Sequence, residues 1–230
     1  MKKTLFGFLL LILTVFVISS CKLNDNNTSS PIASFGIVNV SPNAGNLDVY
    51  LNTTPIVYNL PYGTDTGYFS ISPGAYTFMV DTTGSTAPRL NTSVSFTPGF
   101  TYSIFIIDSS SNLQVAQVED NFTAPATDSA DVRFFNFSPN SPAIDVAVSG
   151  NVLFSSRAYN DVSSNIGLAQ FMTIAPGTYT VELRTAGTST VLYSTSITIT
   201  GGKVYTFYAK GFVGDSGSQS LSIGTVVHNE

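Results

Sequence analysis

The chain of 230 residues lacks tryptophan, contains one cysteine and one histidine, and carries charge on only 10% of its residues. The single cysteine excludes an internal disulfide. With one histidine, His228 near the C-terminus, and one cysteine, the chain has too few ligands for a typical zinc site. The same scarcity argues against a histidine-based catalytic triad. Carboxylates are scattered, and no glycine-rich loop leads into a helix to cradle phosphate. We therefore expect no enzymatic activity, no metal and no cofactor.

Positive charge is scarce as well, with 9 basic against 14 acidic residues. The imbalance is greatest between residues 34 and 126, where Arg89 is the only basic residue against six acidic ones. A surface of this sign repels phosphate backbones, which argues against nucleic acid as a partner. Whether this acidic half binds Ca²⁺ weakly is left open.

Residues 1–20 have the pattern of a secretory signal peptide, with two lysines before an uncharged apolar run. That run, Thr4 to Ile18, is short for a membrane-spanning helix, which needs about 20 apolar residues. It is followed by Ser19-Ser20-Cys21, and Ile18 to Cys21 resembles the bacterial lipobox. We therefore predict that Cys21 is lipidated and that the chain binds a membrane through its acyl chains.

The polar segment after the signal, residues 21–33, contains almost nothing that could be buried and indicates a flexible tether. Lys22 follows the cysteine and does not resemble the aspartate that retains lipoproteins in an inner membrane. We therefore expect an outer-membrane lipoprotein, whose periplasmic or cell-surface orientation stays open.

The remainder of the chain is a duplication. Asn39 to Asn43 (NVSPN) recurs as Asn136 to Asn140 (NFSPN) at an offset of 97 residues, and a later Pro-Gly-x-Tyr motif recurs at an offset of 103. One copy therefore has the length of a small domain. We place the first domain at 34–126, the second at 130–230, and a linker between them.

Apolar residues alternate with polar ones in both copies, which is typical of strands with one buried face. The clearest case is Tyr179, Val181 and Leu183, which alternate with threonine, glutamate and arginine. Glycine and proline recur between such runs, and no apolar stripe is long enough for a helix of ~10 residues. The pattern predicts an all-β protein with two tandem antiparallel β-sandwiches, of immunoglobulin-like topology although the Cys-Trp-Cys hallmark is missing.

The repeated Pro-Gly-x-Tyr motif predicts a turn, with glycine at positive φ and a buried tyrosine ring whose hydroxyl bonds back to the preceding loop. We assign these residues to stability rather than to ligand binding. They are Pro73, Gly74 and Tyr76 in the first copy and Pro176, Gly177 and Tyr179 in the second.

Two aspartates in apolar surroundings, Asp48 and Asp145, follow the repeated Ser-Pro-Asn turn. One interpretation is a structural carboxylate that accepts hydrogen bonds from the turn or a neighbouring strand. The other makes each a ligand in a calcium or glycan site, although one carboxylate is few for an ion that takes 6 to 8 oxygens. Separately, Thr82 and Ser129 each follow an aspartate, which resembles a short O-glycosylation sequon of Gram-negative outer-membrane proteins.

The second copy resembles the family catalogued as domain of unknown function 4397. The resemblance is carried by Val132 to Val148 (VRFFNFSPNSPAIDVAV), Pro176 to Arg184 (PGTYTVELR) and Lys203 to Thr206 (KVYT). The first copy is more diverged, with Ala44-Gly45-Asn46 at a position where the second has Ser-Pro-Ala. The resemblance implies a secreted or lipid-anchored bacterial protein and brings no established activity.

From these patterns we expect a non-enzymatic, lipid-anchored envelope protein that presents two sandwiches for binding or adhesion to a protein or glycan. The alternative is a structural or assembly component of an envelope protein complex. Exposed aromatic residues clustered on one face would favour the binding role, and a large apolar edge would favour assembly.

The lipid anchor predicts that a Cys21→Ser variant leaves the membrane fraction, because the substitution removes the only thiol in the chain. The measurement is fractionation of the native host followed by a carbonate wash. A Cys21→Ser protein that stays with the washed membranes would refute lipidation at this residue.

Overall fold

The computed structural model describes residues 31–85 and 87–228. In this part of the chain the elements are strands and three short 3₁₀ helices. The first eight strands are β1 (Ala33–Asn39), β2 (Leu47–Leu51), β3 (Thr54–Leu60), β4 (Asp65–Ile71), β5 (Gly74–Thr82), β6 (Leu90–Phe96), β7 (Thr101–Ile107) and β8 (Gln114–Glu119). No helix among the described residues is long and apolar enough to cross a membrane.

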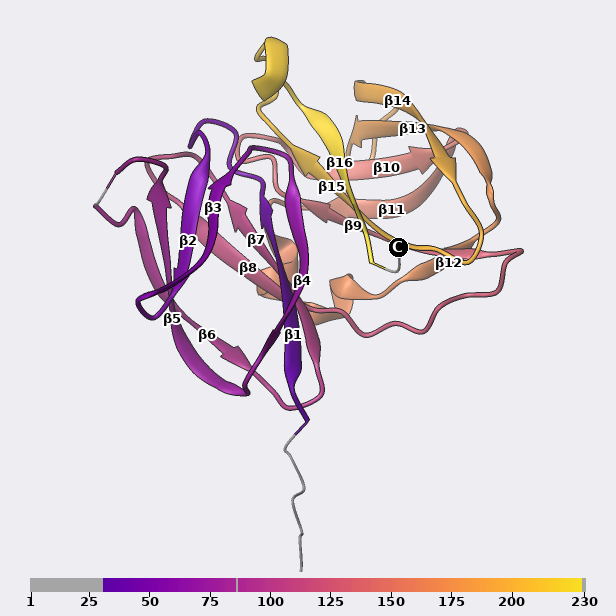
Figure 1. Cartoon of the computed structure of the whole chain (residues 1–230). Helices are drawn as coiled ribbons and strands as arrows, with labels where there is room; N and C mark the ends of the chain where they lie inside the picture. The colour runs from indigo at the N-terminus through magenta and orange to yellow at the C-terminus, as the bar shows by residue number, and fades with distance from the viewer. Residues whose placement is uncertain (1–30, 86, 229–230) are drawn as a thin grey trace, which may run out of the picture. The chain divides into compact units, whose positions relative to one another are not determined.

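The second half repeats this order of strands, with two 3₁₀ turns before its fourth strand (Figure 1). Its strands are β9 (Ala130–Asn136), β10 (Ile144–Val148), β11 (Asn151–Arg157), β12 (Met172–Ile174), β13 (Gly177–Thr185), β14 (Val191–Ile199), β15 (Val204–Lys210) and β16 (Ser222–Val227). The 3₁₀ helices are η1 (Asp161–Ser163), η2 (Ile166–Ala169) and η3 (Gly217–Gln219).

Each half forms two four-stranded sheets that enclose a hydrophobic core, so the predicted all-β class and the two sandwiches are confirmed. In the first sandwich the sheets are β4-β1-β7-β8 and β3-β2-β5-β6, and in the second they are β12-β9-β15-β16 and β11-β10-β13-β14. We call the first sheet of each sandwich its inner sheet and the second its outer sheet.

The predicted immunoglobulin-like topology is wrong. That fold places strands A, B, E and D in one sheet and C, F and G in the other. Here the first strand instead lies between the fourth and the seventh, and it pairs with the seventh in parallel, β1 with β7 and β9 with β15. All other pairs of neighbouring strands are antiparallel. Alternation of residues reveals strands and their buried face, but it does not distinguish these two orders of pairing.

The central strands of the inner sheets, β1, β7, β9 and β15, are buried on both faces, whereas the edge strands β4 and β12 are half-buried or exposed. In β7 every residue from Tyr102 to Ile107 is buried, and β15 is buried from Val204 to Ala209. One face of each inner sheet lies in its own sandwich core. The other face packs against the inner sheet of the other sandwich. Two-sided burial explains why these strands are continuous apolar runs.

A third hydrophobic core, the inter-sandwich core, therefore joins the two inner sheets. Phe105 of β7 lies among aromatic rings of the second sandwich, with ring centroids 5.7 Å from Phe135, 4.9 Å from Phe137 and 5.8 Å from Tyr208. The buried residues of this core are Val38, Val40, Phe105, Ile107, Ala116, Val118, Phe135, Phe137, Val162, Ala169, Tyr208 and Val226.

This packing predicts that the two sandwiches unfold together. Phe105→Ala should lower the free energy of unfolding by about 3–5 kcal/mol, because it leaves a cavity among rings that both sandwiches supply. Phe100→Ala, at a side chain that is 41% exposed in the same sandwich, is the matched control and should change stability by less than about 0.5 kcal/mol. Denaturant unfolding followed by fluorescence and circular dichroism measures both, and two separate transitions in the wild type would contradict the prediction.

Candidate functional site

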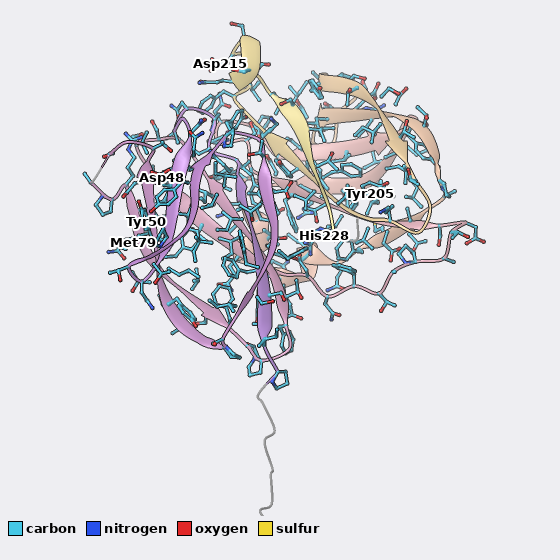
Figure 2. The ribbon with its side chains drawn as sticks, in the orientation of Figure 1. Asp48, Tyr50, Met79, Tyr205, Asp215 and His228 are labelled. Carbon is cyan, nitrogen blue, oxygen red and sulfur yellow. The ribbon has the colours of Figure 1, made fainter. Side chains whose placement is uncertain are left out.

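The outer sheet of the first sandwich carries a group of polar and aromatic side chains on the face turned away from its core. Core residues Leu47 and Val49 alternate along β2 with outward-facing Asp48 and Tyr50. In the register with β5, Asp48 lies opposite Asp81 and Tyr50 lies opposite Met79. Tyr58 of β3 completes the group, which we call the tyrosine-aspartate face: Asp48, Tyr50, Tyr58, Met79 and Asp81. Figure 2 shows Asp48, Tyr50 and Met79 close together on this sheet.

Asp48 has a structural role within this face. Its Oδ1 accepts hydrogen bonds from the backbone N–H of Asn59 at 2.8 Å and from the Thr83 hydroxyl at 2.7 Å. Asn59 has a φ of 57°, beside an irregularity in the pairing of β2 with β3. The carboxylate thus satisfies a backbone donor that the irregular ladder would otherwise leave unpaired.

Asp145 repeats this arrangement in the second sandwich. Its Oδ1 accepts from the backbone N–H of Ser156 at 2.7 Å, and its Oδ2 accepts from that of Gly187 at 2.8 Å. Both carboxylates thus make the hydrogen bonds of the structural interpretation. Within residues 31–85 and 87–228, no three histidine, cysteine, aspartate or glutamate side chains come together as metal ligands.

Asp81 differs from both of these aspartates because one of its oxygens is buried and has no hydrogen-bond partner. The residue is 8% exposed, and its Oδ1 is buried without a hydrogen bond. Two carboxylates directly opposite each other on neighbouring strands repel. In the second sandwich the position opposite Asp145 is held by Arg184, which pairs with Glu182. The second sandwich therefore carries a cation where the first carries a second anion.

Two tyrosines give the face its aromatic part. The rings of Tyr50 and Tyr58 meet edge to face, with centroids 6.1 Å apart and planes at 85°, and Tyr58 is 61% exposed. Partial burial, and then the charges of Tyr58 and the two aspartates, raises the pKa of the Tyr50 hydroxyl above its ordinary value. Tyr50 therefore stays a neutral hydrogen-bond donor beside a flat, accessible ring.

A second polar group lies buried between the sandwiches, and sequence analysis did not find it. Arg133 of β9 donates to the Thr206 hydroxyl at 2.7 Å, to the backbone carbonyl of Glu119 at 3.2 Å and to the carboxylate of Asp120. The other oxygen of Asp120 accepts from Ser103 at 2.8 Å and from Tyr68 at 2.7 Å. An arginine inside an apolar run, between Val132 and Phe134, was the available signal.

His228 belongs to this buried group. Its Nδ1 lies 2.5 Å from the Tyr68 hydroxyl and its Nε2 lies 2.6 Å from the Thr206 hydroxyl, so both ring nitrogens have partners. The rings of Phe122 and Phe171 pack on the imidazole, with centroids at 5.4 and 6.1 Å. A groove of about 290 Å³ beside it is lined by residues of β1, β4, β7 and β16. The imidazole is thus held by structural contacts at both nitrogens.

Burial lowers the pKa of His228 to about 4, even though the Asp120 carboxylate, 3.9 Å from Nδ1, favours the charged form. Loss of hydration is the larger effect because the side chain has no exposed surface. The folded chain therefore holds His228 neutral at pH 7.

The remaining predicted residues are the two motif tyrosines, the two candidates for O-glycosylation and Cys21. Tyr76 and Tyr179 donate to the carbonyls of Ser72 and Ala175, each at 2.8 Å, but their rings are half-buried rather than buried because they lie at the start of a strand beside the loop. The Thr82 hydroxyl is buried without a hydrogen bond, and glycosylation at this residue stays a prediction. Ser129 is half-buried and stays a prediction. Cys21 lies outside the described residues.

The family to which the chain belongs follows from a match along nearly all of the described residues. The family model described as domain of unknown function (DUF4397) matches residues 33–147 and 137–227. The chain belongs to the DUF4397 family. The first DUF4397 match continues through β9 into β10, so the two matches overlap at the Ser-Pro-Asn turn of the second sandwich.

No curated protein matches the chain. Among solved structures, it is similar to one described as "Alpha-glucan binding by a streptococcal virulence factor", with 10% identity, a TM-score of 0.25, and coverage of 84% of this chain and 96% of the other. It is also similar to the family CBM26 module of Eubacterium rectale Amy13K in complex with maltoheptaose. There the identity is 9%, the TM-score 0.27, and the coverage 86% of this DUF4397 chain and 97% of the module.

The buried histidine predicts a loss of stability in mild acid. His228 has a folded pKa of about 4 and ionises near 6.5 when unfolded, so its contribution is complete above pH 6.5 and is lost as the pH falls towards 4. The full loss is roughly 3 kcal/mol. Denaturant unfolding of wild type and His228→Gln at pH 7 and pH 5 measures it. Equal pH dependence in the two proteins would contradict the prediction.

Proposed function

We propose that this chain is a non-enzymatic, lipid-anchored envelope protein that binds an extracellular glycan through the tyrosine-aspartate face. The observation that carries the proposal is the exposed ring of Tyr58, set edge to face against Tyr50, whose strand neighbour Asp48 lies opposite Asp81. Aromatic rings pack against the C–H faces of sugars. Hydroxyl and carboxylate groups at the ring edge pair with sugar hydroxyls.

The size and polarity of the face favour a sugar over a protein partner. A stable protein interface buries about 800 Å² on each side around a desolvated apolar centre. On the tyrosine-aspartate face the apolar part consists of two tyrosines and Met79, and the other two members of the face are aspartates. The other large apolar side chains that are exposed in the described part of the chain, such as Phe100, Val152 and Val191, belong to different strands or loops.

The second sandwich lacks most of the residues that form this face in the first. At the positions equivalent to Tyr50 and Tyr58 the second sandwich has Ala147 and Ser155, so its outer sheet lacks the aromatic pair. Glu182 and Arg184 stand at the positions of Met79 and Asp81 and pair with each other. The binding face that we propose therefore belongs to the first sandwich alone.

Anchoring follows from Cys21 and the signal sequence before it. We place the lipid in the outer membrane, with the segment between Cys21 and β1 as the tether and the two sandwiches held together by their common core. The titratable groups of the inter-sandwich region support a non-enzymatic role, because their hydrogen bonds are made inside the protein. Arg133 donates to Asp120 and to Thr206, and the Tyr68 hydroxyl joins Asp120 to His228.

A second role, assembly with another envelope protein, is favoured by one observation. Strand β14 lies at the edge of the outer sheet of the second sandwich, spans nine residues and contains no charged residue or proline. An uncharged edge strand of this length can pair with a strand from another chain. This edge belongs to a sheet of the second sandwich and the aromatic pair to a sheet of the first, so variants separate the two roles.

Glycan binding is tested with the purified soluble domains, residues 31–230, on an array of bacterial and host oligosaccharides. Tyr58→Ala should lower affinity for the retained glycan by about tenfold or more, because it removes the accessible ring. Phe100→Ala, which removes another exposed ring, should leave affinity unchanged. Equal loss in both variants, or retention by Tyr58→Ala, would contradict the proposed face.

A further inference from the structure

The two aspartates of the tyrosine-aspartate face form an uncompensated pair of negative charges. Asp48 is 7% exposed and Asp81 is 8% exposed, and they lie directly opposite each other in the β2-β5 ladder. Side chains opposite each other in such a ladder have Cβ atoms about 5 Å apart. Both oxygens of a buried carboxylate need a donor or a cation, and Asp81 Oδ1 has neither among the described residues.

Among the described residues of the first sandwich, Arg89 is the one basic side chain. Arg89 follows directly on the last paired position of β6 and β5, since its backbone N–H donates to the carbonyl of Val80 at 2.8 Å. Its side chain is exposed and makes no ion pair with Asp48 or Asp81. The charge of the aspartate pair is therefore left for a group from outside the chain.

We propose that a divalent cation of the calcium class binds between Asp48 and Asp81. Calcium takes carboxylate oxygens in flexible geometry and tolerates water in its remaining positions. Asp81 Oδ1 supplies one oxygen without losing a hydrogen bond, and Asp48 Oδ2 supplies another because its two hydrogen bonds are at Oδ1. Two protein carboxylates give a weak site, with a Kd on the order of 1 mM, as in extracellular calcium modules.

In the second sandwich, the position opposite the equivalent aspartate is occupied by an arginine, which is a cation supplied by the chain itself. Asp145 uses both of its oxygens on backbone N–H groups, and Arg184 stands opposite it. Asp48 uses only one oxygen and faces a carboxylate. The two copies therefore differ in two ways. Arg184 in the second sandwich corresponds to Asp81 in the first, and Asp48 has hydrogen bonds at one oxygen where Asp145 has them at both.

The cation site is independent of glycan binding, although it lies beside Tyr50 and would add a partner for sugar hydroxyls. An ion coordinated by water on its outer side can exchange that water for vicinal hydroxyls of a sugar packed on Tyr58. If calcium binds and no sugar does, the cation site holds and the proposed function fails. If a sugar binds equally well with chelator, the proposed function holds without the cation, and the terbium measurement alone decides the cation site.

The test uses Tb³⁺, a luminescent substitute for Ca²⁺ that is excited through nearby aromatic rings. The chain has no tryptophan, so sensitised emission reports tyrosines, and Tyr50 and Tyr58 lie next to the site. We expect wild-type residues 31–230 to give emission that excess Ca²⁺ removes. Asp81→Asn should lose it, and Asp128→Asn, at an exposed aspartate before β9, should keep it.

A second measurement uses thermal unfolding. Calcium at ~10 mM should raise the wild-type Tm by roughly 3–5 °C and leave Asp81→Asn unchanged. Without calcium, Asp81→Asn should melt above wild type, because it removes the repulsion and supplies a donor to Asp48. Emission that is equal in wild type and Asp81→Asn would overturn the proposal. So would emission that appears only in Arg89→Gln, since Arg89 would then be the cation that neutralises the pair.

Discussion

Burial of both faces of the central strands β1, β7, β9 and β15 is the constraint on which the rest of this structure depends. Strands that are apolar on both sides have to be covered on both sides, and here each inner sheet covers the other through Phe105, Phe135 and Phe137. Arg133 and Asp120 lie at the same interface, fully inside, where the loss of either partner would leave a buried charge. The two sandwiches are therefore one packed unit in the described part of the chain.

This packing determines which surfaces remain for binding. The inner sheets pack against each other, and both ring nitrogens of His228 have hydrogen-bond partners there. The faces that remain open to a ligand are therefore those of the outer sheets. Duplication supplied two such faces, and they have diverged. One is closed by the ion pair of Arg184 with Glu182, and the other keeps an open aromatic ring at Tyr58 and the orphaned oxygen of Asp81.

Much of the fold is predictable from the sequence, because alternation and repeated turns have local causes. The strand around Tyr179 and the duplication at the Ser-Pro-Asn turn are examples. The parallel pairing of β1 with β7 is not predictable in this way, since it depends on contacts between residues far apart in the chain. The partner of Asp48 was missed for the same reason, because Asp81 is 33 residues away and only the register brings it opposite.

The central claim is that ligand binding belongs to the outer sheet of the first sandwich. Hydrogen exchange on the intact chain, with and without a glycan retained from the array, tests it most directly. The account predicts added protection confined to peptides that cover β2 and β3 (47–60) and β5 (74–82). Protection at β10, β11 and β13, or at the groove beside His228, with none in the first outer sheet, would contradict it.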